Sequence, residues 1–205
     1  MTFFNTRTKR AKPAANYVED RFRSTRMQQV DKLERQIASQ FAKLTISGAL
    51  LDAPCGPGRF VDVFQSVERY VGVDLNEEAI IEARLRHSGP GREFLVGSVL
   101  CLPFQDNEFD SVFCMRLLHH VPSEIMMAQI IKEIARVSST YVLLSFYRSS
   151  GIRYWLKRLR GKKVSGFPVK PELVEQICQN QGLVKIDGVK IPKSKQMIFI
   201  LKKIN

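Results

Sequence analysis

The stretch that decides the fold is LLDAPCGPGRF, residues 50–60. An apolar run ends at Asp52, two glycines follow at Gly56 and Gly58, and a helical pattern comes next. In a parallel sheet, a glycine turn between a strand and a helix presents backbone to a nucleotide-like ligand. A second apolar run, YVGVD, ends at Asp74, 18 residues after Gly56. An acid there can accept from both hydroxyls of a ribose, so the pair predicts a cofactor site.

Apolar runs alternate with helical patterns over the rest of the chain. Predicted strands cover residues 49–53, 70–74, 93–96, 110–115, 141–146, 184–189 and 196–202. Predicted helices cover residues 27–44, 59–66, 77–86, 123–137 and 171–181. Strands that alternate with helices are joined by right-handed crossovers, whereas the last two strands lie too close together for a crossover. The expected fold is α/β: a doubly wound, mostly parallel seven-stranded sheet with helices on both faces and an antiparallel C-terminal hairpin.

Length and composition predict one domain with small additions, because 205 residues with 44% hydrophobic content can form one good core. We expect a basic, mobile arm over residues 1–26, a single domain over 27–205, and a substrate-covering insertion over 147–170. No apolar run is long enough for a membrane helix, and the basic N-terminus does not resemble a secretory signal. A cytoplasmic protein without a transmembrane segment is therefore expected.

The net charge of +12 is concentrated in two clusters. Such clusters attract phosphate on RNA, on anionic lipid or on a small metabolite, although charged residues also serve simply to keep a surface solvated. The four cysteines have neither metal-ligand spacing nor the density of a disulfide framework, which predicts reduced thiols and no metal. The clusters are Arg7, Lys9, Arg10, Lys12, Arg21, Arg23 and Arg26, and Arg148, Arg153, Lys157, Arg158, Arg160, Lys162 and Lys163.

Two residues near the glycine turn qualify the cofactor prediction. A dinucleotide fold places a third glycine where this chain has Val61, which disfavours NAD and FAD. Asp52 ends its apolar strand, where an unpaired carboxylate is costly. It either binds a cationic group of the ligand, directly or through water, or ties down the glycine loop.

Residues 97–112, GSVLCLPFQDNEFDSV, complete a combination of motifs with residues 51–58 and 71–74. The combination resembles the class I S-adenosylmethionine-dependent methyltransferases, especially the small-molecule enzymes related to ubiquinone biosynthesis. The resemblance covers residues 50–146, about half of the chain. It implies S-adenosylmethionine as the cofactor and methyl transfer as the reaction.

The resemblance also implies a role for each matching position. The loop from Ala53 to Gly58 would pass under the methionine part of the cofactor, Asp74 would bind the ribose, and Leu75 would lie against adenine. The family commonly has an acid where this chain has Ser98, so that contact is weaker here. The predicted cofactor-binding residues are Asp52, Ala53, Pro54, Gly56, Gly58, Asp74, Leu75, Ser98, Val99, Met115 and Arg116.

Three residues are candidates for catalysis because they follow predicted strands at the carboxyl edge of the sheet, where ligands of such sheets bind. His119 and His120 come after the fourth strand, and a neutral imidazole can take a proton from a hydroxyl or amine. One of them can instead steady the loop. Tyr147, after the fifth strand, can orient an acceptor or form the rim of the site.

The leading functional prediction is a methyltransferase acting on a small acceptor, either anionic or lipid-linked. The first alternative is a tRNA or rRNA methyltransferase, because of the two basic clusters. The second alternative is a non-catalytic protein that binds S-adenosylmethionine and serves as a regulatory or assembly partner. A nicotinamide-dependent oxidoreductase is disfavoured by Val61.

Overall fold

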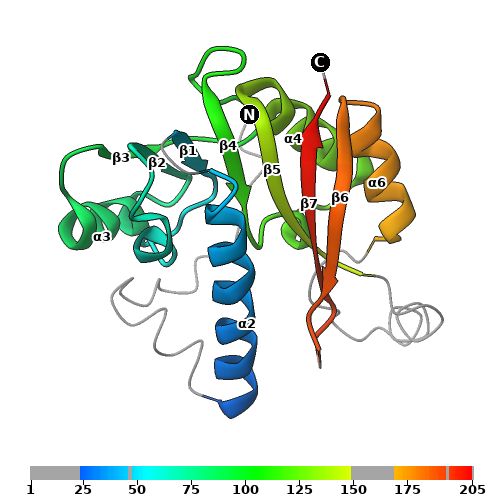
Figure 1. Ribbon diagram of the computed structural model, residues 1–205, viewed down its shortest axis with the longest axis horizontal. Helices are drawn as coiled ribbons and strands as arrows, with labels where there is room; N and C mark the ends of the chain where they lie inside the picture. The colour runs from blue at the N-terminus through cyan, green and yellow to red at the C-terminus, as the bar shows by residue number, and fades with distance from the viewer. Residues whose placement is uncertain (1–23, 46–47, 149–168, 193, 205) are drawn as a thin grey trace.

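The computed structural model describes residues 24–45, 48–148, 169–192 and 194–204. The predicted arm over 1–26 and the predicted insertion over 147–170 therefore fall almost wholly outside the described residues. A seven-stranded sheet extends through the described part in the order β3-β2-β1-β4-β5-β7-β6 (Figure 1). Its strands are β1 (Ala49–Asp52), β2 (Arg69–Asp74), β3 (Arg92–Val96), β4 (Phe109–Cys114), β5 (Ser138–Tyr147), β6 (Leu183–Lys190) and β7 (Gln196–Lys203).

The first five strands of the sheet are parallel, and β7 is antiparallel to both β5 and β6. This arrangement confirms the predicted doubly wound α/β fold with an antiparallel C-terminal hairpin. The antiparallel pairing follows from the short connection at residues 191–195, which cannot carry a crossover.

Successive residues of a strand point to opposite faces of the sheet. Helices cover the apolar side chains on both faces. Leu51 belongs to a buried core cluster that also contains residues of α4 (Glu124–Val137) and α6 (Pro171–Gln179). Its neighbour Leu50 belongs to a second cluster, with residues of α2 (Thr25–Ala42), α3 (Glu77–His87) and the 3-10 helix η1 (Val61–Phe64). Both core clusters extend beneath the strands, so both faces of the sheet are buried, as in other doubly wound folds.

Local sequence explains where most helices begin. The side chains of Ser24, Asn76 and Ser123 accept hydrogen bonds from backbone amides of the first turns of α2, α3 and α4. Pro171 opens α6, where its missing N–H is not needed.

The helix predicted over residues 59–66 is the exception. The structure has only the four-residue 3-10 helix η1 there. Gly58 has a left-handed φ of 81° and Phe60 lies outside helical geometry. The residues after the glycine turn therefore do not begin an α-helix. The α-helix predicted over residues 59–66 is therefore wrong in type and in length.

Candidate cofactor and active site

A cavity of about 300 Å³ lies at the carboxyl ends of β2, β1 and β4. The chain passes from β1 to β2 and β3 on one side and returns to β4 on the other, so the strand order reverses between β1 and β4. Open α/β sheets bind their ligands at such a switch point. The lining residues are Pro54, Cys55, Gly56, Pro57, Arg59, Phe60, Asp74, Leu75, Gly97, Ser98, Val99, Leu100, Met115, Arg116, Leu117, His120 and Ile130.

The two glycines of the turn have different structural roles. Gly56 lines the cavity with φ 56°, and no atom lies within 4 Å of the position that a Cβ would take. A ligand can therefore approach its backbone closely. At Gly58, a Cβ would lie 2.5 Å from Cδ2 of His87, so this glycine allows the end of α3 to pack against the loop. The structure does not place Gly58 in the cavity lining.

Asp74 connects the glycine loop to the end of β2. One carboxylate oxygen accepts from the Gly56 amide at 2.8 Å, and the other accepts from the Asn76 amide at 2.9 Å. Each carboxylate oxygen has two lone-pair sites, so these bonds leave capacity for ligand hydroxyls. Asp74 and Leu75 both line the cavity.

The wall after β3 contains Ser98 and Val99. The Ser98 hydroxyl accepts from the Leu100 amide at 3.2 Å and thereby closes a tight local turn. Ser98 itself lines the cavity, at the position where the resemblance implies an acid.

Met115 and Arg116 form the wall after β4. Arg116 has a left-handed φ of 63°, which is rare for a residue with a bulky side chain. Its amide donates to the Ser145 hydroxyl on β5 at 2.6 Å, a bond that holds the unusual backbone in place. Strained backbone of this kind concentrates at functional sites.

The three candidate catalytic residues form one aromatic stack. The rings of His119 and Tyr147 lie nearly parallel with centroids 4.0 Å apart, and the His119 and His120 centroids are also 4.0 Å apart. Of the three, His120 lines the cavity; His119 is buried behind it, and Tyr147 lies at the far end of the stack. The geometry thus puts one imidazole at the cavity and two rings in support.

Asp52 lies beneath the glycine loop instead of in the cavity lining. Its side chain is buried, and one oxygen accepts from the Tyr70 hydroxyl at 2.5 Å. Burial raises the pKa of this carboxyl from its usual 3.8 to about 8. The other oxygen has no hydrogen-bond partner among the described residues. Ala53 is also fully buried and outside the lining, so the structure places both residues behind the loop.

Two residues near the cavity were not predicted from the sequence. Arg59 lines the cavity, and Glu34 of α2 contacts Arg59. Arg59 directly follows the glycine turn, so its position next to the ligand loop was the available signal. Glu34 sits in the apolar stripe of α2 between Val30 and Ile37, and all three are buried. An acid within an apolar stripe is the signal that a buried charge pair leaves in a sequence.

Comparisons with known proteins agree with this geometry. Residues 51–141 match the family described as methyltransferase domain. Over this stretch the chain is similar to methyltransferase domains. The protein is similar in fold to the magnesium protoporphyrin IX methyltransferase of Synechocystis with bound S-adenosylhomocysteine, at a TM-score of 0.74 and 18% identity over 91% of this chain and 94% of that one.

Curated proteins similar to this chain have diverse names. Phthiotriol/phenolphthiotriol dimycocerosates methyltransferase 1 of Mycobacterium ulcerans is 29% identical over 146 residues, 67% of this chain and 53% of that protein. The probable tRNA methyltransferase 9B of Homo sapiens is 34% identical over 99 residues, 48% of this chain and 21% of that protein. The chain thus spans about half the length of the first relative and about a fifth of the second.

The described residues fit the methyl donor. The cavity is at the small end of the range for ligand sites, about 300–1,000 Å³, and it combines an acid at a strand end with a glycine that leaves room for a ligand. Among the residues that the structure describes, no group of three or more His, Cys, Asp or Glu is arranged to hold a metal ion. None of the described helices is long and apolar enough to span a membrane.

Proposed function

We propose that this protein transfers the methyl group of S-adenosylmethionine to a small acceptor that is anionic or lipid-linked. The observation that carries the proposal is the arrangement of the cavity, which has a glycine loop and Asp74 at one end and an imidazole, His120, at the other. One end suits the nucleoside of the methyl donor. The other end suits the deprotonation of an acceptor.

The residues that line the cavity also indicate how S-adenosylmethionine would bind. Asp74 would accept from the ribose hydroxyls, and Leu75 would lie against the adenine with Val99 and Ser98 on the adjoining wall. Pro54 and Gly56 would pass beneath the methionine half. Met115 and Arg116 would flank the methionine end, because they follow β4 on the opposite side of β1 from Asp74.

The protein has two chemical tasks. S-adenosylmethionine supplies a methyl group bound to a positively charged sulfur, which is already a good leaving group. The chain must place the acceptor atom about 3–3.5 Å from that methyl and take a proton if the atom has one. His120 is the proposed base. His119 and Tyr147 are proposed to hold its ring through the aromatic stack.

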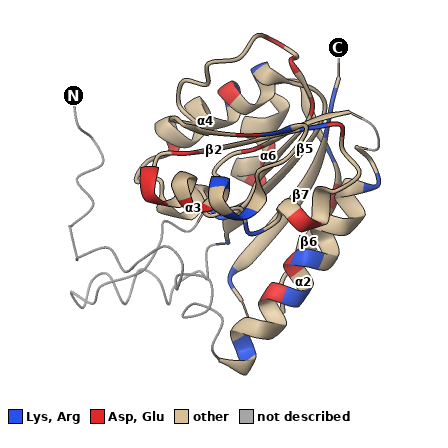
Figure 2. Cartoon of the chain, turned by 90° about the vertical axis from the view of Figure 1, so that its left-hand side faces the viewer, with Lys and Arg blue, Asp and Glu red and all other residues tan. Residues whose placement is uncertain are grey.

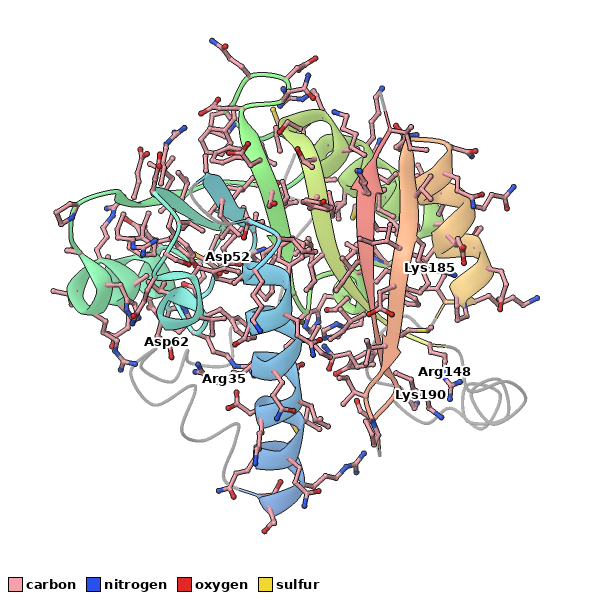
Figure 3. All side chains as sticks on the ribbon, in the orientation of Figure 1. Arg35, Asp52, Asp62, Arg148, Lys185 and Lys190 are labelled. Carbon is pink, nitrogen blue, oxygen red and sulfur yellow. The ribbon has the colours of Figure 1, made fainter. Side chains whose placement is uncertain are left out.

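Two observations favour a small acceptor that is anionic or lipid-linked. The relative from Mycobacterium ulcerans is named for phthiotriol and phenolphthiotriol dimycocerosates. Four cations also lie near the carboxyl end of β5: the Lys195 carbonyl accepts from the Arg148 amide, and Lys190 ends β6, on the far side of β7. Arg148 and Lys190 lie at the same end of the molecule (Figure 3). The fourth, Lys170, precedes α6.

A test of the catalytic assignment compares wild-type protein with His120→Ala. We expect methyl incorporation into a responsive metabolite or lipid fraction to fall by about 10²- to 10⁴-fold, the usual contribution of a general base. Affinity for S-adenosylmethionine, measured by calorimetry, should change by no more than about twofold. Unchanged turnover in His120→Ala would remove His120 from the reaction.

RNA is the second candidate acceptor, because the human relative is named for tRNA and because of the cations near β5. Methyl incorporation into RNA, together with binding that weakens steeply as salt rises, would reverse our order of candidates. No RNA binding at low salt would eliminate this candidate. If the protein bound S-adenosylmethionine but methylated no metabolite, lipid or RNA fraction, the non-catalytic regulatory or assembly role would replace both.

A further inference from the structure

Glu34 is a buried acid behind the wall of the cavity, where it contacts two arginines that line it. It lies on α2, its side chain is fully buried, and each of its two carboxylate oxygens contacts a different arginine. Oε2 accepts from Arg59 Nη2 at 2.6 Å. Oε1 accepts from Arg116 Nε at 2.8 Å and lies 2.7 Å from Nη2 of the same guanidinium. We call these three residues the Glu34 clamp.

The two arginines of the clamp belong to opposite sides of the glycine loop. Arg59 directly follows Gly58, whereas Arg116 follows β4. Both line the cavity, and their side chains are only 10% and 11% exposed. Arg59 also contacts Asp31, one turn earlier on α2. Acidic and basic residues are interspersed along this helix (Figure 2). The clamp thus connects α2, the glycine loop and the end of β4.

Burying the charged groups of the Glu34 clamp costs free energy, so we expect the clamp to serve the site. A buried carboxylate without partners is strongly destabilising, and even a buried ion pair is often no more stable than apolar residues of the same volume. Glu34 replaces an apolar residue in the stripe of α2, and Arg116 adopts an unfavourable backbone conformation. What the arrangement does provide is two guanidinium groups fixed in orientation at the cavity wall.

The clamp lies at the end of the cavity away from Asp74. β2 and β4 are separated by β1, so their ends are about 10 Å apart at two strand spacings. In the proposed binding mode, this separation places the ribose at Asp74 and the amino-acid half of the cofactor near Arg116. The helix after the glycine turn has only four residues, so aligned helix amides contribute little positive charge here. Side chains must supply it.

We propose that Glu34 is a positioning residue that orients Arg59 and Arg116 so that this pair binds the α-carboxylate of S-adenosylmethionine. Guanidinium groups recognise carboxylates through paired N–H donors, and their geometry must be fixed for two groups to converge on one ligand. Glu34 supplies that fixation from α2. The inference rests on the proposed cofactor and not on the acceptor, so a failed acceptor screen leaves it standing.

The experiment compares S-adenosylmethionine with its decarboxylated analogue, which lacks only the α-carboxylate. Calorimetry gives the affinity of the full-length protein for each. We expect the wild type to prefer S-adenosylmethionine by about tenfold or more, the value of a charge-assisted hydrogen bond. Glu34→Gln should lose most of that preference, with a fall in affinity for S-adenosylmethionine and a change of no more than about twofold for the analogue.

Asp62→Asn is the matched control. Asp62 of η1 pairs with Arg35 of α2 at 2.8 Å, on the outer side of the same helix (Figure 3). This pair also joins α2 to the segment after the glycine loop, but neither residue lines the cavity. Asp62→Asn should leave the preference for S-adenosylmethionine unchanged. If it erased the preference as Glu34→Gln does, docking of α2 and not orientation of the arginines would be responsible, and the proposal would fall.

A second variant keeps the test valid if Glu34→Gln does not fold. Arg116→Asn keeps a residue that tolerates left-handed backbone and leaves Glu34 paired with Arg59. It should reduce the same preference. In the double variant, the two effects should be less than additive, because Glu34 acts partly through Arg116. Three results would overturn the proposal: equal losses of affinity for both ligands, full additivity of the two variants' effects, or a wild type that does not distinguish the two ligands. An assignment of the two arginines to a carboxylate of the acceptor would overturn it as well.

Discussion

At the scale of single residues, Asp74 shows how one side chain both builds the site and faces the ligand. Its two oxygens accept from the amides of Gly56 and Asn76, so it fixes the glycine loop and the chain after β2. The same carboxylate lines the cavity. The strand-end position of this acid is a local feature of the sequence, which is why the sequence alone could predict that it belongs to the candidate site.

Asp74→Ala should therefore lower affinity for S-adenosylmethionine by about 100-fold or more. The substitution removes the charged acceptor of two proposed hydrogen bonds donated by the ribose hydroxyls, each worth about 1.5–3 kcal/mol, and loosens the loop. Calorimetry measures the affinity. Asp187→Ala is the control, because Asp187 is an exposed acid on β6, remote from the cavity lining. Wild-type affinity in Asp74→Ala would mean that the cofactor binds elsewhere.

At the scale of elements, α4 holds the connection between β3 and β4 through one arginine. Arg136 donates to the carbonyls of Leu102 and Phe104 and pairs with Asp106 at 2.8 Å. Glu133, one turn earlier, accepts from the Leu102 amide. Pairing with Arg136 holds the pKa of Glu133 below its usual value. Two charged side chains thus satisfy the backbone of a loop that would otherwise lack hydrogen-bond partners.

Arg136→Ala should lower the free energy of unfolding by about 2 kcal/mol, the value of losing charge-assisted bonds to partly buried carbonyls. Urea denaturation followed by circular dichroism measures this change. Lys132→Ala changes an exposed position of the same helix and should stay within about 0.5 kcal/mol of wild type. Equal stability of the two variants would show that the loop holds itself in place.

A strand and a helix show which features of the fold could be predicted from the sequence and which could not. The strand from Arg69 to Asp74 was predicted within one residue because its apolar run is continuous and ends at an acid. The helix expected over residues 59–66 is a short 3-10 turn, since the left-handed Gly58 and the packing of Phe60 and Phe64 against Phe113 decide its geometry. Those contacts join residues about 50 positions apart along the chain and leave no local pattern.

At the scale of the whole molecule, the sheet order explains which site residues the sequence could supply. Asp74 ends a strand and Gly56, Ser98 and His120 follow strands, so the parallel topology brings all four to one edge. The Glu34 clamp is different, because it depends on how α2 packs across the sheet face. Its closest pair, Glu34 and Arg59, is separated by 25 residues. Periodicity predicts that α2 packs on the sheet, but it does not specify which strand end an internal acid reaches.

Asp52 makes the stability of the whole molecule depend on pH. Burial raises its pKa in the folded state from 3.8 to about 8, so the folded protein keeps a proton that the unfolded chain releases across that window. The free energy of unfolding from this group is therefore greatest below pH 4 and falls as pH rises towards 8. The carboxyl is fully buried, so solvent does not screen the effect.

Asp52→Asn should remove this pH dependence, because the amide is of similar size and does not titrate. We expect the stability of the variant relative to wild type to improve by up to about 4 kcal/mol between about pH 5 and about pH 8, at about 1.4 kcal/mol for each pH unit. Urea denaturation at the two pH values gives the difference. Parallel pH profiles for the two proteins would show that Asp52 is ionised in the folded state, with the Tyr70 hydroxyl bond offsetting its burial.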